Sequence, residues 1–163
     1  MSAPSDGPPS SDALSDDATR DAVTAALAAE HAAIWAYGLV SAFLPATVGT
    51  DLAAAALAHR ERRDAVVALL EGAGVPAPPA AAAYRTPAPV TDTPSAAALA
   101  VVAESDVAAA WRAVCERTEA ADGGELRTLG IDAMVAAASV GVRWRRLAGT
   151  EPVVPVFPGL PDP

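Results

Sequence analysis

Three side chains that could bind a metal ion or exchange a proton lie on otherwise apolar helix faces: Glu30, His59 and Glu104. Each is separated from apolar neighbours by three or four residues, which is the spacing of one face of an α-helix. A charge on such a core-facing side is costly unless it is paired, protonated or bound to a cation. Two carboxylates and an imidazole are suitable ligands for iron, manganese or zinc. One interpretation is therefore a partial metal site made of these three residues.

A second interpretation needs no metal. Arg63 lies one turn after His59 on the same predicted stripe, and a guanidinium can neutralise a buried carboxylate with two directed hydrogen bonds. Tyr37 lies two turns after Glu30 and could donate a further hydrogen bond. A buried network of this kind can fix the register of the helices without adding stability. Its predicted members are Glu30, Tyr37, His59, Arg63 and Glu104.

The elements that must position these residues are helices. Hydrophobic residues make up 52% of the chain and many of them are alanine, which favours helix. The alternation of β-branched and aromatic residues that is typical of strands is missing. The sequence therefore predicts an all-α fold with four helices, over residues 18–44, 51–71, 94–121 and 125–147.

The expected helix ends follow from capping residues and breakers. Asp16 or Asp17 can cap the first helix, and Pro45 ends it. Thr50 is the expected N-cap of the second helix, and Gly72 suits its left-handed end. Thr93, followed by Pro94, is the expected N-cap of the third helix.

Gly149 ends the fourth helix, and the connections between helices are short, long and short. The long one, between the second and third helices, is the proline-rich stretch 72–93. A single long crossover of this kind is the ferritin-like arrangement of a four-helix bundle. We expect a disordered acidic tail over 1–17, the bundle over 18–149, and an extended proline-rich tail over 150–163 whose apolar residues dock on the bundle.

Four stretches carry a resemblance to a known group: AAEHAAIWAYG, AHRERRDAVVALL, AAYRTPAPVTD and SAAALAVVAESDVAAAW. Over residues 22–160 the chain resembles a ferritin-like domain family of unknown function from GC-rich bacteria. The resemblance implies a ferritin-like fold and no established activity. Working di-iron proteins of that fold use single glutamates on two helices and a Glu-x-x-His pair on each of the other two.

Only part of that ligand set has a match in this chain. Glu30 and Glu104 match the two single glutamates, and His59 matches the histidine of one pair. The position three residues before His59 is Ala56, and the fourth helix offers no matching glutamate or histidine. Half of the ligand set of a dinuclear centre is therefore missing, and both a catalytic and a non-catalytic function stay open at this point.

Charge and composition bound the remaining functions. The net charge of −9 argues against a nucleic-acid or anionic-membrane surface. Cys115 is the only cysteine, no signal peptide is visible, and no uncharged run approaches the length of a membrane span. We expect a cytoplasmic protein, and the alanine-rich helix faces suit a homodimer.

Three functions follow from these observations. The first is a non-catalytic scaffold or binding module that contains the buried network and no cofactor. The alternative is a metal-binding oxidoreductase that holds iron or manganese with a reduced ligand set. A third is a pocket for an apolar or anionic small molecule, with Tyr37 and Arg63 as polar handles.

Overall fold

The computed structural model describes residues 14–118 and 124–160, and these residues form a bundle of four long helices. The predicted all-α fold is confirmed, since no strand occurs in these two ranges. Most of the predicted acidic tail, residues 119–123 and the last three residues lie outside them. The elements are α1 (Asp17–Val40), the 3-10 helix η2 (Ala46–Val48), α2 (Gly49–Gly72), α3 (Thr93–Arg117) and α4 (Gly124–Ala148).

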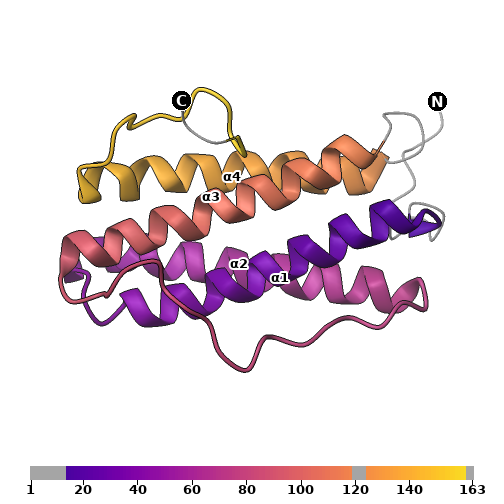
Figure 1. Ribbon diagram of the computed structural model, residues 1–163, viewed down its shortest axis with the longest axis horizontal. Coiled ribbons are helices and arrows are strands. Elements are labelled where there is room, and N and C mark those ends of the chain that lie inside the picture. Colours follow the sequence, from indigo (N-terminus) through magenta and orange to yellow (C-terminus); the bar gives the residue numbers. More distant parts are fainter. Residues whose placement is uncertain (1–13, 119–123, 161–163) are drawn as a thin grey trace.

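The helices pack as two pairs. Figure 1 shows α1 beside α2 and α3 beside α4, with one pair laid on the other. The extensive contacts join α3 to α4, α1 to α3 and α1 to α2, so α2 packs chiefly on α1. The core contains mostly alanine, valine and leucine, and α3 carries the largest share of it. Small side chains let the helix backbones approach each other closely. Polar side chains from different helices can therefore reach one another inside the bundle.

The first two helices begin and end slightly differently from the prediction. Asp16 caps α1 by accepting a hydrogen bond from the Thr19 amide over 2.9 Å. The helix ends at Val40 rather than at residue 44. The predicted N-cap at Thr50 is wrong, because α2 begins at Gly49 directly after η2 and has no side-chain cap. The left-handed residue after α2 is Gly74, with φ 72°, and not Gly72.

The connector over residues 73–92 runs along the bundle from the end of α2 to the start of α3 (Figure 1). Its Tyr84 ring packs against Trp35 of α1, with ring centroids 5.5 Å apart. The N-cap of α3 is Asp92, which forms a reciprocal capping box with Ser95, so the predicted N-cap at Thr93 is wrong. Thr93 instead donates to the Phe43 carbonyl over 2.8 Å and links the start of α3 to the turn that follows α1.

The segment after Gly149 lies against α3 and α4 without regular secondary structure (Figure 1). The apolar side chains that were expected to dock are mostly exposed; these are Val154, Val156, Phe157 and Leu160. The backbone makes the contacts instead. Arg145 donates to the Pro152 carbonyl over 3.0 Å. Pro155, Pro158 and Gly159 also line a cavity together with residues of α3 and α4, whereas Val154 and Val156 are exposed.

One described helix, α1, is long and apolar enough by length and composition to cross a membrane. The core helix of a soluble protein passes the same test, and the apolar side of α1 packs inside the bundle through residues such as Val23 and Leu27.

Candidate functional site

Glu30 lies at the centre of a buried polar network and has no solvent exposure. Its Oε1 accepts hydrogen bonds from Arg62 Nε and Trp111 Nε1, each over 2.7 Å. Its Oε2 lies 2.7 Å from His59 Nδ1. Both oxygens of this carboxyl group are therefore engaged by N–H groups from α2 and α3. An acidic side chain inside an apolar core is held there by three donors.

Glu104 of α3 forms the other end of the network. Its Oε1 lies 3.2 Å from His59 Nε2 and also accepts a hydrogen bond from the Tyr37 hydroxyl. The Tyr37 oxygen in turn accepts from Trp144 Nε1 over 2.7 Å. Since Trp144 belongs to α4, the network joins side chains from all four helices in the middle of the bundle.

The antiparallel packing of α1 and α3 explains this pairing. Glu30 and Tyr37 lie two turns apart on α1, and Glu104 and Trp111 lie two turns apart on α3. Because the two helices run in opposite directions, the aromatic residue of each helix meets the carboxyl group of the other. His59 of α2 lies between the two carboxyl groups and contacts both.

The protonation states follow from burial and hydrogen bonding together. Burial alone would raise the pKa of Glu30, but hydrogen bonds with His59 and Arg62 outweigh it and hold the pKa below its usual range. Burial alone would lower the pKa of His59, but hydrogen bonds with Glu104 and Glu30 outweigh it and raise the pKa. The raised pKa favours the charged imidazole, which donates to Glu104 from Nε2 and to Glu30 from Nδ1. In the neutral form without a proton on Nδ1, that nitrogen would instead accept from Arg62 Nη2.

Tyr37 and Arg62 are the remaining titratable hydrogen-bond donors of the network. Burial and the neighbouring Glu104 raise the pKa of Tyr37 far above its usual value, so its hydroxyl remains a hydrogen-bond donor. Arg62 Nη2 lies 2.7 Å from His59 Nδ1, and Arg62 Nε contacts Glu30. Two carboxyl groups thus meet two basic side chains, which permits charge balance within the network.

Four of the five residues predicted for the network lie together: Glu30, Tyr37, His59 and Glu104. The inclusion of Arg63 is wrong, because its guanidinium is partly exposed and pairs with the adjacent Asp64 over 2.8 Å. Arg62 takes the predicted role. It lies three residues after His59 rather than four, and this is the side of α2 that faces Glu30.

The sequence interpretation also missed two donors, Trp111 and Trp144. Both indoles are fully buried, and a buried indole N–H needs an acceptor. The signal in the sequence was helical spacing, since Trp111 follows Glu104 by seven residues and lies on the same face of α3. The expected small-molecule pocket with Tyr37 and Arg63 as joint handles is wrong. Tyr37 is buried and engaged with Glu104 and Trp144, whereas Arg63 lies outside the network.

As arranged, the three predicted metal ligands do not converge on one point. The two nitrogens of His59 face two different carboxyl groups, and N–H donors occupy both oxygens of Glu30. Within residues 14–118 and 124–160, no group of three or more His, Cys, Asp or Glu side chains is placed to hold a metal ion. In this arrangement the residues fit a hydrogen-bonded network and not a coordination sphere.

The chain is similar to a protein family and to solved structures. The profile of the family described as "Domain of unknown function (DUF4439)" matches residues 22–162. A crystal structure of a conserved hypothetical protein, Rv2844, from Mycobacterium tuberculosis is similar, with a TM-score of 0.75 and 43% sequence identity. That match covers 86% of this chain and 97% of the other. Among curated proteins, none matches.

Proposed function

The chain belongs to the family described as a domain of unknown function (DUF4439), and we propose that within it this protein is a non-catalytic scaffold or binding module. The observation that carries the proposal is the closed state of the network. Glu30, His59 and Glu104 are at most 2% exposed, and the network groups bond mainly to one another. A general acid or base must reach a substrate atom within hydrogen-bond distance, and these groups face inward.

In this proposal the network fixes how the helices meet. Its hydrogen bonds are directional and come from all four helices, so sliding one helix by a turn would leave several buried polar groups without partners. Apolar alanine faces alone are much less selective, because many registers bury similar area. Buried polar groups can act in this way even when they add little net stability.

We also propose that the bundle is ferritin-like, with one long crossover between α2 and α3. The path of the connector along the bundle supports this (Figure 1), and so does the contribution of core-facing carboxyl groups by α1 and α3. On this view, His59, Arg62 and the two tryptophans occupy the space that a metal centre fills in working relatives of that fold.

An alternative function is metal binding, with iron or manganese on Glu30, His59 and Glu104. One observation favours it: Glu104 Oε2 is buried and has no hydrogen-bond partner. For these residues to act as ligands, His59 would have to release a proton and turn, and Arg62 would have to withdraw from Glu30. A bound metal would then supply redox or Lewis-acid chemistry.

The same protein is proposed to form a homodimer. Apolar side chains that the isolated chain leaves exposed would support this, among them Ile131 and Val135, which lie one turn apart on α4. Light scattering after size-exclusion chromatography measures the mass directly. A dimer that becomes a monomer in Val135→Glu is the expected result, and a wild-type monomer at all concentrations would contradict this part.

The experiment that tests the main proposal is metal content per chain, by mass spectrometry of untagged protein purified without chelators. His31→Ala is the matched control for His59→Ala, because His31 is the only other histidine. We expect substoichiometric metal in wild type and in both variants. Stoichiometric iron or manganese that disappears in His59→Ala and persists in His31→Ala would overturn the proposal in favour of the metal-binding alternative.

A further inference from the structure

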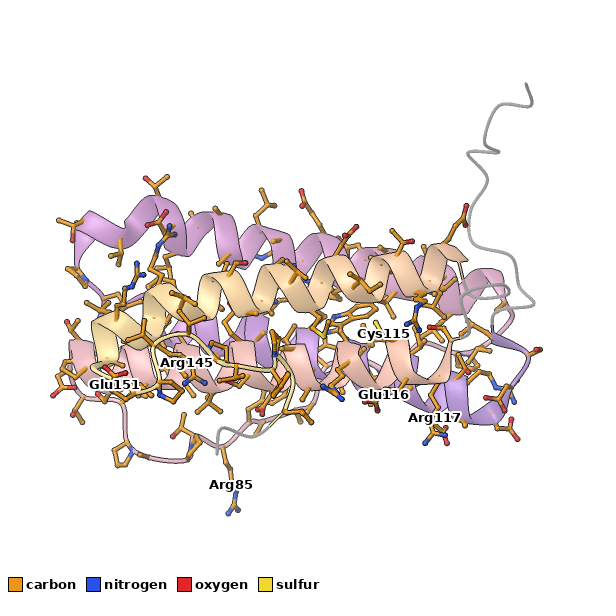
Figure 2. All side chains as sticks on the ribbon, turned by 90° about the horizontal axis from the view of Figure 1, so that it is seen from above. Arg85, Cys115, Glu116, Arg117, Arg145 and Glu151 are labelled. Atoms are coloured by element: carbon orange, nitrogen blue, oxygen red, sulfur yellow. The ribbon has the colours of Figure 1, made fainter. Side chains whose placement is uncertain are left out.

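A small cavity of about 30 Å³ lies between α3, α4 and the C-terminal segment. Glu104 and Ala108 line it from α3, Gly141 and Arg145 line it from α4, and Gly159 lines it from the C-terminal segment. Figure 2 shows Arg145 beside that segment. The cavity therefore adjoins the network at Glu104.

Glu104 brings an unpartnered acceptor to this place. Both of its hydrogen bonds end on Oε1, whereas Oε2 is buried without a partner within the protein. The residue as a whole is only 2% exposed, so bulk solvent does not satisfy this oxygen. An unsatisfied buried acceptor is expensive, and native proteins commonly satisfy such groups with an ordered water.

The size and polarity of the cavity indicate which molecule can fit in it. A buried water needs roughly 10–15 Å³ of this kind of space and two or more polar partners, so the cavity has room for one or two waters. It is too small for an organic ligand. Glu104 and Arg145 are the charged residues of its lining, and Arg145 also donates to the Pro152 carbonyl.

We propose that this cavity is a site for one or two structural waters that donate a hydrogen bond to Glu104 Oε2. The inference rests on the metal-free network of the proposed function. Water at this position makes the C-terminal segment part of the buried network, because the segment closes the side of the cavity that α3 and α4 leave open.

Gly159 is what allows the segment to close the site. Its φ is 79°, and a Cβ at this position would lie 2.7 Å from the Ala108 carbonyl oxygen of α3. Both the backbone conformation and the close approach require glycine. A side chain here would push the segment away from α3 and open the cavity to solvent.

Gly141 offers a way to fill the site without a clash. A Cβ at Gly141 would have Glu104 Cβ as its nearest neighbour, at 3.5 Å, which is ordinary van der Waals contact. Gly38 is the matched control, because it lies within α1 and nothing is within 4 Å of a Cβ there. Alanine is the better helix former at both positions.

The first readout is the thermal unfolding midpoint. We expect Gly38→Ala to raise it, and Gly141→Ala to lower it by about 2–4 °C relative to that control, because the new methyl group displaces water that Glu104 needs. If Gly141→Ala raises the midpoint as much as Gly38→Ala does, the water site is overturned.

The second readout is a high-resolution crystal structure of the wild-type protein, which decides the matter even if Gly141→Ala does not fold. We expect electron density within hydrogen-bond distance of Glu104 Oε2, without anomalous signal. An empty cavity would overturn the water site and leave the proposed function intact. An anomalous peak at Glu104 would overturn both, because it would show a metal ion in place of water.

Discussion

Glu30 and Glu104 are buried to the same degree in one network, but their surroundings differ. Glu30 receives three N–H groups on its two oxygens, and one of them belongs to the guanidinium of Arg62. Glu104 receives two donors on a single oxygen, and its other oxygen has no partner within the protein. The carboxyl group of α1 is thus enclosed by protein donors, and that of α3 is half enclosed.

The difference comes from the helix that each carboxyl group faces. Glu30 faces α2, which supplies His59 and Arg62, and α3, which supplies Trp111. On the α4 side, the Cβ of Glu104 faces Gly141, which has no side chain to donate. Burial alone therefore does not set the cost of a buried acid; the number of hydrogen-bond donors and the presence of a cation do.

The largest expected effect is at Glu30. Replacement by glutamine removes the anion that faces both His59, which is buried, and Arg62, which is partly buried, and leaves these two basic groups with one carboxyl group. We expect the free energy of unfolding to fall by about 3–5 kcal/mol, measured by urea denaturation. Glu104→Gln is the paired variant and should cost less, about 1–3 kcal/mol, because water can adapt to its amide. An equal or greater loss at Glu104 would contradict the comparison.

The next effect separates two adjacent arginines. Arg62→Ala removes the guanidinium from Glu30, and we expect a loss of about 2–4 kcal/mol in the free energy of unfolding. Arg63→Ala is the control, because its exposed pair with Asp64 should change stability by less than about 0.5 kcal/mol. Similar losses in the two variants would mean that Arg63 also supports the buried network.

A smaller effect is expected on the Glu104 side. Tyr37→Phe removes a donor from Glu104 and leaves the buried Trp144 N–H without an acceptor, so we expect a loss of about 1–3 kcal/mol. Trp144→Phe removes the N–H that donates to Tyr37, so its loss in the free energy of unfolding should overlap with the loss in Tyr37→Phe. In a double-mutant cycle, the loss in the free energy of unfolding of the double variant should be smaller than the sum of the two single losses by at least about 0.5 kcal/mol. Strict additivity would show that the two residues act independently.

The smallest expected effect is the change in the free energy of unfolding with pH. The pKa of Glu30 is lowered on folding, so its contribution is complete above its usual pKa of about 4.3 and is lost as the pH falls through the folded value. The pKa of His59 is raised, so its contribution is complete below about 6.5 and is lost as the pH rises through the folded value.

We therefore expect stability to be greatest between about pH 4.5 and 6.5, and to fall above that window by at most about 1.4 kcal/mol per pH unit. Urea denaturation at several pH values measures the slope. His31→Ala should keep the decline above the window, and His59→Gln should remove it. A decline that survives in His59→Gln would assign it to another group.

Much of the fold was predictable because it depends on local chemistry. Alanine-rich sequence without strand alternation fixed the helical class, Asp16 capped α1 as expected, and Gly149 follows α4 in the left-handed region with φ 68°. The inward positions of Glu30, His59 and Glu104 followed from helical spacing, and all three are buried. These features need only neighbours within a turn or two.

The predictions were wrong where two neighbouring residues suited the same role equally well. Arg62 and Arg63 are both about one turn from His59, so each lies on a stripe that contains that histidine. Similarly, Asp92 and Thr93 are both good N-caps, and the capping box with Ser95 decided between them. In the C-terminal segment, Val154 and Val156 are exposed, whereas Pro155 and Pro158 line a cavity with helix residues.

The sequence by itself determined that four helices form and that acids and a histidine point into their core. Only the tertiary structure decided which groups meet there, because the partners are far apart in the chain: Trp111 reaches Glu30 across 81 residues, and Trp144 reaches Tyr37 across 107. Helical spacing sets the direction of a side chain relative to its own axis. The angle and the register at which α2 and α4 pack against α1 and α3 set which donor reaches which acceptor, and these depend on the whole core at once.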